Sequence, residues 1–258
     1  MKHGDFTELA KHYHNRPAFS EFLLKKLVAC VNDGNRDIDS LRVVEVGAGT
    51  GKLTKMLDAL GLQVVAVEPN DNMRNEGMAY TKNSKVHWRK GCGEYTGVES
   101  NSADWVIMAN SFHWTDPSKS LPEFRRILDS SGGGGYFTSI ANPRNIIEGS
   151  VFDKIEKNIK QIVPELIRVA SAIQDVKKWE EILVSTGDFT DCFFMECDYV
   201  EKMDKERYLG IWHSVNDIQV QAGEKLWREI LAMIETEIKS FDILEIPYKI
   251  RSWTVKVV

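Results

Sequence analysis

The chain has 258 residues, of which 43% are hydrophobic and 28% are charged, and its formal net charge is −5. This composition is ordinary for a globular protein in water, and the length suits one α/β domain with a full core. The sequence has no cluster of five or more Lys and Arg and no apolar run near 18 residues, which disfavours a nucleic-acid partner and a membrane span.

The predicted elements begin with an amphipathic helix within residues 5–31. Short apolar strands then alternate with helical segments from residue 41 to residue 141. Such alternation predicts a parallel sheet with helices on both faces, which is a doubly wound α/β fold. Beyond residue 142 the pattern changes to a helix-rich stretch, a strand, an amphipathic helix and a last strand.

The first strand runs into a glycine-rich loop, with residues 43–51 reading VVEVGAGTG. A turn this tight lets the backbone approach a bulky ligand, and the free N–H groups at the following helix N-terminus favour a negative ligand group. The second strand, residues 64–67, ends at Glu68, nineteen residues after Gly49. In nucleoside-binding βαβ units, an acid at about this distance accepts hydrogen bonds from the ribose hydroxyls.

The glycine spacing separates two classes of nucleoside ligand. A dinucleotide site has the pattern G-x-G-x-x-G, and its third glycine would stand where this chain has Lys52. Here the pattern is G-x-G-x-G, with Glu45 two residues before the first glycine. The spacing therefore disfavours a nicotinamide dehydrogenase, while a generic strand-to-helix turn stays open as the plain alternative.

Three further segments carry a resemblance to a known family. Residues 90–97 read KGCGEYTG, residues 110–116 read NSFHWTD, and four glycines at 132–135 precede the strand at 136–140. With the glycine loop, these segments resemble the class I S-adenosylmethionine-dependent methyltransferases. The resemblance is to the small-molecule branch that contains the trans-aconitate and quinone-pathway enzymes.

The resemblance implies a Rossmann-like sheet of seven strands in the order 3-2-1-4-5-7-6, with the last strand antiparallel and with helical cap insertions. It implies one methyltransferase domain over residues 1–258. Its expected parts are an N-terminal helical entry at 1–40, a cofactor-binding core at 41–141, a cap with a strand that binds substrate at 142–222, and a covering helix with the final strand at 223–258.

The resemblance also implies S-adenosyl-L-methionine as the cofactor and S-adenosyl-L-homocysteine as its product. Glu68 would hold the ribose, Glu45 would order the glycine loop or reach the methionine ammonium, and Tyr13 would close over the methionine end. Residues 92–94 stand where the family contacts the adenine. The expected cofactor-binding residues are Tyr13, Glu45, Gly47, Ala48, Gly49, Gly51, Glu68, Pro69, Cys92, Gly93, Glu94 and Asn110.

The candidate catalytic residue is His113, the one histidine of the expected pocket loop, because a histidine can serve as a base near neutral pH. A base is needed only if the acceptor is not already ionised. Trp114 and Trp212, together with His113, are the candidates for substrate contact. The plain alternative for each of them is a packed structural side chain.

The function that these features favour is methyl transfer to a small molecule, at a carboxylate or a hydroxyl oxygen. One alternative is a nucleic-acid methyltransferase, because the glycine loop and Asn110 are similar to the rRNA adenine dimethylases. The next residues, Ser111 and Phe112, differ from the proline-aromatic pair with which those enzymes clamp a flipped base. A second alternative is a cofactor-binding regulator without catalysis.

The N-terminus and the cysteines favour a cytoplasmic location. Residues 1–5 lack the apolar core of a signal peptide. The cysteines contain no C-x-x-C pair, and their spacing predicts neither a metal site nor a disulfide framework. We expect a monomer or a homodimer that has no membrane or nucleic-acid partner.

Overall fold

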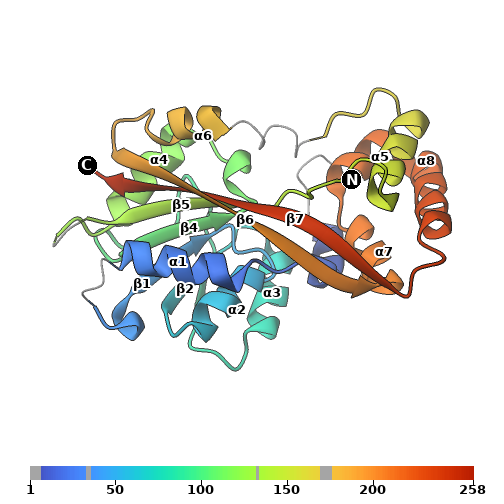
Figure 1. The fold of residues 1–258 in the computed structure, drawn as a ribbon. Coiled ribbons are helices and arrows are strands. Elements are labelled where there is room, and N and C mark those ends of the chain that lie inside the picture. The colour runs from blue at the N-terminus through green and yellow to red at the C-terminus, as the bar shows by residue number, and fades with distance from the viewer. Residues whose placement is uncertain (1–6, 33–35, 132–133, 169–175) are drawn as a thin grey trace. The chain divides into compact units, whose positions relative to one another are not determined.

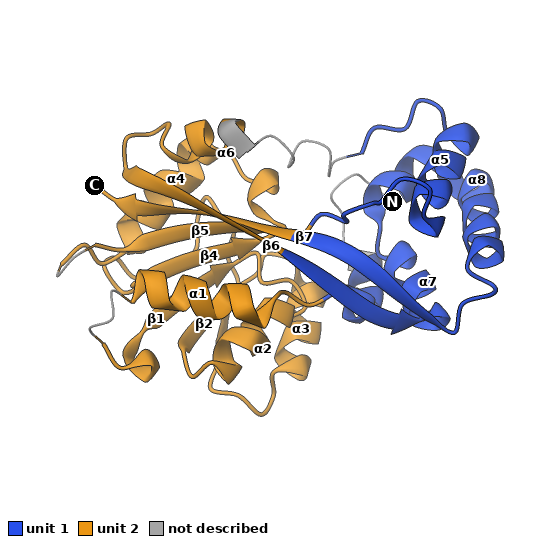
Figure 2. Ribbon diagram, in the orientation of Figure 1, with its two compact units in different colours: residues 1–17, 143–172, 198–249 blue, residues 18–142, 173–197, 250–258 orange. Residues whose placement is uncertain are grey.

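The computed structural model describes residues 7–32, 36–131, 134–168 and 176–258. The chain divides into two compact units, coloured separately in Figure 2. Unit 1 consists of residues 1–17, 143–172 and 198–249, and unit 2 of residues 18–142, 173–197 and 250–258. Each unit is described by itself, and the single domain expected from the sequence stays a prediction.

Unit 2 is built on a seven-stranded sheet of order β3-β2-β1-β4-β5-β7-β6. The pairs of β1 with β2, β1 with β4, β2 with β3 and β4 with β5 are parallel, whereas β7 is antiparallel to β5. This order and the antiparallel strand confirm the predicted fold. The strands are β1 (Arg42–Val46), β2 (Gln63–Val67), β3 (His87–Arg89), β4 (Trp105–Ala109), β5 (Tyr136–Ala141), β6 (Phe189–Asp204) and β7 (Ile243–Val257), and the last two also contribute residues to unit 1.

Helices cover both faces of this sheet, as Figure 1 shows. One face carries α1 (Glu21–Val31), α2 (Lys52–Ala59) and α3 (Asp71–Tyr80), and the other carries α4 (Pro117–Ile127) and α6 (Val176–Leu183). The short 3-10 helices η2 (Ile38–Ser40) and η3 (Phe112–Trp114) lie in connections. The central strands are buried on both faces, which explains why their sequences are continuous apolar runs rather than alternating ones.

Local sequence signals fix where the helices of unit 2 begin. Asn70 caps α3, because its side chain accepts hydrogen bonds from Asn72 and Met73. Asp116 caps α4 in the same way, and Pro117 follows at the first helical position, where its missing N–H costs nothing. These two caps turn the chain just after the carboxyl ends of β2 and β4, so both helices start at the edge where ligands bind in such sheets.

Unit 1 contains η1 (Thr7–Asn15), α5 (Val151–Ile162), α7 (Lys205–His213) and α8 (Asn216–Glu237). Its core includes Ile155 of α5 and Ile230 and Ile234 of α8, all fully buried. The backbone of α8 is interrupted at Gly223, where φ is +68°, so the amphipathic pattern predicted from residue 224 is the second of two helical parts. Among the described residues of both units, each helix is too short or too polar to cross a membrane.

Candidate functional site

The glycine loop follows β1 in a conformation that favours glycine. Gly47, Gly49 and Gly51 have φ values of +70°, +59° and +80°, the left-handed region that side chains disfavour. The backbone N–H groups of Gly47 and Ala48 both donate to the carbonyl of Val67, at 2.8 and 3.1 Å. The loop is therefore tied to the carboxyl end of β2 before α2 begins at Lys52.

The first two glycines of the loop are needed for different reasons. A Cβ at Gly47 would stand 2.7 Å from Cβ and Oγ of Ser111, so a side chain there would collide with the loop after β4. A Cβ at Gly49 would meet the Met73 Cε at 3.5 Å, an ordinary contact, which leaves open space above the loop. The sterics of the fold explain Gly47, whereas the open space at Gly49 is available to a ligand.

Glu68 lies directly after β2 and is held by the backbone. Its Oε2 accepts a hydrogen bond from the Gly49 N–H and its Oε1 one from the Asn70 N–H, both at 2.9 Å. The residue is 6% exposed, so the carboxylate is buried rather than solvated. Burial raises the pKa of Glu68, while the hydrogen bonds from Asn70 and Gly49 oppose that rise.

Glu45, near the end of β1, is more deeply buried and points to the neighbouring helix. It is 2% exposed, and its Oε2 accepts a hydrogen bond from the Thr54 hydroxyl of α2 at 2.5 Å. Burial raises the pKa of Glu45 to about 8, and the nearby Glu68 adds to the rise. The structure thus joins Glu45 to α2 through Thr54, and its predicted role toward a methionine ammonium stays a prediction.

Residues 92–94 form a tight turn beside the N-terminus of α4. Cys92 and Tyr95 exchange backbone hydrogen bonds, and Glu94 Oε1 accepts one from the Asp116 N–H at 2.8 Å. A Cβ at Gly93 would approach Cγ2 of Thr115 to 2.5 Å, so this glycine is required by close packing. Each of the three residues has a structural role, and their predicted contact with an adenine stays a prediction.

Asn110 follows β4 directly and has a positive φ of +52°, which for a residue other than glycine is uncommon. Its N–H donates to Ile140, and its Oδ1 accepts from the Asn142 N–H at 2.9 Å, so β4 and the segment after β5 are fixed to each other. Ser111 follows, with its hydroxyl 3.2 Å from the Val46 carbonyl. The exits of β1, β4 and β5 are therefore linked by hydrogen bonds.

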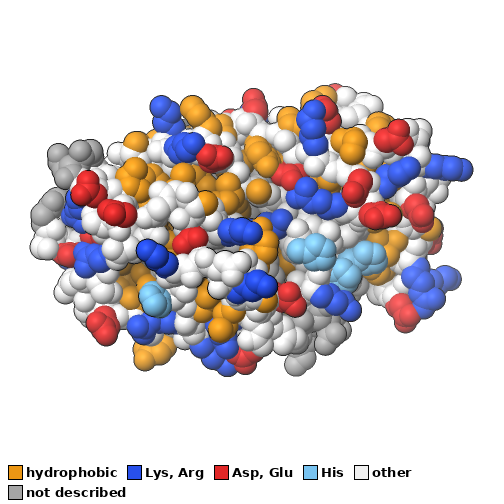
Figure 3. All heavy atoms as spheres, turned by 90° about the horizontal axis from the view of Figure 1, so that it is seen from below, with side chains coloured by type: hydrophobic (Ala, Val, Ile, Leu, Met, Phe, Trp, Pro, Cys, Tyr) orange, Lys and Arg blue, Asp and Glu red, His pale blue; other side chains and the backbone are white. Residues whose placement is uncertain are grey.

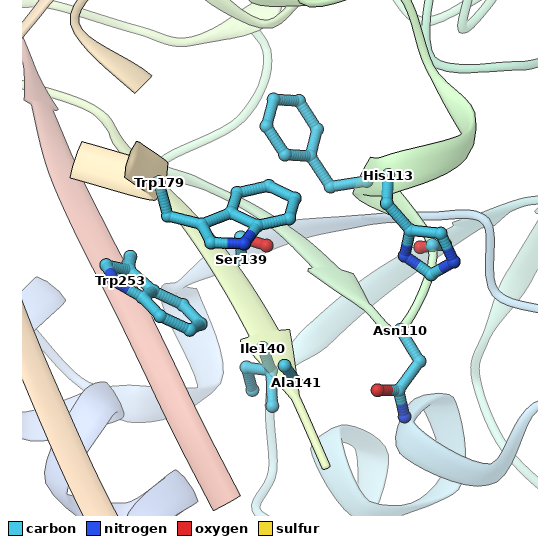
Figure 4. Close-up of a pocket in the computed structure, with 9 residues that line it drawn as sticks. Asn110, His113, Ser139, Ile140, Ala141, Trp179 and Trp253 are labelled. Atoms are coloured by element: carbon cyan, nitrogen blue, oxygen red, sulfur yellow. The ribbon is translucent and has the colours of Figure 1, made fainter. Parts of the chain in front are cut away.

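A small cavity of about 10 Å³ lies beside these exits, entirely within unit 2. A cavity of this volume is at the lower limit for holding one water molecule. In Figure 4 the indoles of Trp179 and Trp253 lie on one side of it and His113 and Asn110 on the other. The nine residues that line it are Asn110, Ser111, Phe112, His113, Ser139, Ile140, Ala141, Trp179 and Trp253.

His113 lies in η3 against Trp114, with 5.0 Å between the ring centroids. Burial lowers the pKa of His113 to about 4, so the imidazole is neutral at physiological pH. Trp114 is 42% exposed, so half of its indole is open to solvent. The structure places His113 at the cavity, as the sequence predicts, but as a weak base.

The remaining predicted residues divide between the units. Ala48 is buried within the glycine loop, and Pro69 is exposed after Glu68. Tyr13 and Trp212 belong to unit 1, where the Arg16 guanidinium lies 5.2 Å from the Tyr13 ring centroid and Trp212 is fully buried. Their predicted contacts with cofactor and substrate stay predictions.

Of the residues that line the cavity, the sequence predicts only Asn110 and His113 as site residues, and those it misses include Ser111, Trp179 and Trp253. Ser111 was read only as a departure from another family's motif. Trp179 in α6 and Trp253 in β7 each belong to an ordinary amphipathic pattern. Their ring centroids are 5.9 Å apart, although 74 positions separate the two residues in the sequence. No local signal marks such a pair, because only the folded sheet brings it together.

The fold and the loop define the class of the protein: a Rossmann-like α/β protein whose glycine loop and strand-end acid suit a nucleoside ligand. Comparison with known proteins narrows this class. Residues 44–134 match a family described as a methyltransferase domain. This segment contains the glycine loop, Glu68, the turn at 92–94 and His113.

Two curated relatives and one solved structure agree with that match. An uncharacterized methyltransferase of Mycobacterium tuberculosis is 40% identical over 103 residues, 40% of this chain and 42% of the relative. An uncharacterized methyltransferase of Schizosaccharomyces pombe is 24% identical over 94% of both chains. A proposed type II methyltransferase of Anaeromyxobacter dehalogenans aligns with a TM-score of 0.59 at 15% identity, covering 93% of this chain and 96% of that one.

Residues 44–134 are therefore similar to a methyltransferase domain, and the chain has the fold of the class I S-adenosylmethionine-dependent methyltransferases. The matched segment covers 42% of the length of the mycobacterial relative. The narrower trans-aconitate branch stays a prediction.

Proposed function

We propose that the protein is an S-adenosylmethionine-dependent methyltransferase that methylates a small molecule at a carboxylate or a hydroxyl oxygen. The observation that carries this proposal is the position of Glu68. Its carboxylate is held by two backbone N–H groups, one of them from Gly49 in the glycine loop. A hydrogen bond thus connects Glu68, which would bind the ribose of the donor, to the glycine loop, which would contact the rest of the donor.

The residues present fit such a donor. Each oxygen of an ionised carboxylate has two acceptor sites, so Glu68 can keep both backbone hydrogen bonds and still accept from a ribose diol. Above the loop, the space at Gly49 is free of side chains apart from the methyl group of Met73. The backbone bonds orient the Glu68 carboxylate before any ligand arrives, which lowers the entropic cost of binding.

The chain's own contribution to the reaction would be alignment and the exclusion of water. When bound, S-adenosylmethionine supplies a methyl carbon that its sulfonium already activates. Asn110 and Ser111 hold the exits of the central strands in place through their hydrogen bonds. His113, with a pKa of about 4, is poorly suited to take a proton at neutral pH, which favours an acceptor that is already ionised.

The charge distribution supports a small acceptor over a nucleic acid. The formal net charge is −5, and on the face in Figure 3 acidic side chains are interspersed with basic ones. Phosphate backbones are bound by clusters of Lys and Arg. In addition, Ser111 turns its hydroxyl to the backbone of Val46 and Phe112 is buried, so neither presents the aromatic clamp of an enzyme that flips bases.

The test is a transfer assay with S-adenosylmethionine and two panels of acceptors, organic acids and hydroxylated compounds. Mass spectrometry follows the methylated product and S-adenosylhomocysteine together. We expect turnover with a member of the acid panel. Donor binding without transfer to either panel, but with transfer to a structured RNA, would overturn the small-molecule assignment. Donor binding without any transfer would favour the regulator.

A further inference from the structure

Unit 1 contains a half-buried arginine, Arg144, that is held in a fixed position. The chain around Arg144 pairs with β7: the Asn145 N–H donates to Pro247 and the Lys249 N–H donates to Pro143, at 2.8 and 2.9 Å. The Arg144 side chain is 17% exposed, and its Nη2 lies 3.0 Å from Oε1 of Glu156. Arginine has five N–H donors in a planar fork, so one ion pair leaves donors for a second partner.

Two further donors beside this guanidinium have no hydrogen-bond partner among the residues that the structure describes. The guanidinium carbon of Arg144 is 4.5 Å from the ring centroid of Trp212, whose Nε1–H is buried and unpaired. The hydroxyl of Tyr208 is also buried and unpaired, one helical turn earlier on α7. Both residues are 1% exposed. A buried polar group without a partner costs about 1–3 kcal/mol, so two in contact call for an explanation.

These groups lie close enough to act on one another. The rings of Tyr208 and Trp212 are 6.1 Å apart and nearly perpendicular. Burial raises the pKa of Tyr208, and the charge of Arg144 is the largest influence that opposes the rise. The tyrosine therefore keeps its proton at neutral pH, so Arg144, Tyr208 and Trp212 offer N–H and O–H donors in one place.

Several charged groups lie near these donors. Glu156 is shared by Arg144 and Arg168, and Arg168 also pairs with Asp217 at 3.2 Å. Arg16, whose charge acts on the neighbouring Tyr248, donates to the hydroxyl and the carbonyl of Ser214, which are neutral. Nearby Arg207 and Glu201 pair with each other at 2.6 Å and cancel.

We propose that Arg144, Tyr208 and Trp212 form a binding site in unit 1 for the carboxylate group of an organic anion. A planar guanidinium, an O–H and an N–H match the acceptor positions of a carboxylate. A carboxylate brings one negative charge in a planar group, which matches the fork of N–H donors that Arg144 presents. The aromatic rings suit the apolar part of such a ligand. The inference goes beyond the proposed function, because binding needs no methyl transfer.

The experiment follows the indole N–H signals of the full chain by ¹H–¹⁵N NMR during a titration with sodium acetate. The chain has seven tryptophans, and the signal missing from Trp212→Phe identifies Trp212. We expect the Trp212 signal to shift saturably with acetate, but not with sodium chloride at equal ionic strength. Absence of a saturable shift, or tighter binding of inorganic phosphate than of acetate, would overturn the carboxylate site.

Two variants test the donors. Arg144→Gln should weaken acetate binding at least tenfold, and the double variant Arg144→Gln with Glu156→Gln should do the same without leaving Glu156 unpaired. Tyr208→Phe should weaken acetate binding and also raise the melting temperature without anion, because it removes a buried hydroxyl that lacks a partner. Unchanged acetate binding in the double variant would contradict the proposal.

Tyr199→Phe is the matched control for Tyr208→Phe. The Tyr199 hydroxyl donates to Glu201, so its loss should lower the melting temperature and leave acetate binding unchanged. A Tyr208→Phe variant that loses stability as Tyr199→Phe does would show that the Tyr208 hydroxyl already has a partner, and would contradict the site. S-adenosylmethionine takes no part in these measurements, so their failure leaves the proposed function untouched.

Discussion

The two edges of the sheet in unit 2, where the parallel strands begin and where they end, differ in the hydrogen-bond donors that their buried acids meet. At the edge where the strands begin, Asp104 accepts hydrogen bonds from the side chains of Arg36 and Arg42, each at 2.6 Å at its shortest. At the edge where the strands end, Glu45 meets the Thr54 hydroxyl, and Glu68 meets backbone N–H groups. One edge neutralises its acid with arginines, whereas the other uses neutral donors.

The pKa values follow this difference. Burial raises the pKa of Asp104, but the hydrogen bonds from Arg42 and Arg36 outweigh it and the net shift is downward. At the other edge, burial raises the pKa of both Glu45 and Glu68 and lowers that of His113. Clustered pKa shifts of this kind are typical of sites that receive a ligand. The difference supports a stabilising role for the first edge and agrees with the ligand site proposed at the second.

The largest expected effect comes from two glycines of like conformation at opposite edges. Gly49→Val should abolish S-adenosylmethionine binding, because the side chain would fill the space above the loop. Gly61→Val, in the turn before β2, has a φ of +87° and open space around its Cβ. Both variants should lose about 1–3 kcal/mol of stability through backbone strain. Isothermal titration calorimetry measures the binding, and equal affinities in the two variants would remove the distinction between the edges.

Charge removal at the first edge should affect stability alone. Asp104→Asn should lower the free energy of unfolding by about 1–3 kcal/mol, since Arg36 and Arg42 lose a charged acceptor but stay partly solvated. Urea denaturation measures this loss. The affinity of the folded variant for S-adenosylmethionine should equal that of the wild type. A tenfold weaker affinity would show that the first edge influences ligand binding at the second, which contradicts the comparison.

The raised pKa of Glu45 predicts that stability falls as the pH rises toward 8. The folded state holds a proton on Glu45 up to about pH 8, whereas an unfolded chain releases it near the ordinary value of 4.5. Between these values the folded state binds more protons, so stability falls by up to about 1.4 kcal/mol per pH unit from about pH 5 to 8 and levels off above that range. In Glu45→Gln this part of the slope should vanish. An unchanged slope would show that Glu45 is ionised in the folded protein.

The smallest expected effect is that of His113→Ala on turnover with a carboxylate acceptor. Because the imidazole has a pKa of about 4 and the acceptor is already ionised, kcat should change less than about threefold. Donor affinity measured by calorimetry serves as the control and should stay constant. A loss of kcat of about a hundredfold at constant affinity would instead identify His113 as a general base.

The sequence predicts the features that depend on neighbours along the chain. Alternating apolar segments give the parallel sheet, and the glycine loop and Glu68 are recognisable by their spacing alone. The partner of Glu68 was not predictable in the same way, because its bond to the Gly49 N–H forms only when β1 and β2 pair. The antiparallel β7 came from resemblance and not from any local pattern.

Contacts between distant segments account for what sequence reasoning missed. Ser111 limits the space at Gly47, and Trp179 meets Trp253 only across the folded sheet. Likewise, Arg144 reaches Trp212 because residues 143–145 pair with β7. A cation, a hydroxyl and an indole separated by tens of residues carry no common motif, so the sequence alone could not join them.

The central claim is that Glu68 holds the ribose of the donor, and calorimetric titration with S-adenosylhomocysteine tests it most directly. Glu68→Gln should bind about 10- to 100-fold more weakly than the wild type, which corresponds to the 1.5–3 kcal/mol of hydrogen bonds to a charged group. Asp71→Asn, a nearby exposed acid paired with Arg74 and Lys90, should bind as the wild type does. Equal affinity in Glu68→Gln, or micromolar binding of NADH in place of S-adenosylhomocysteine, would contradict the account.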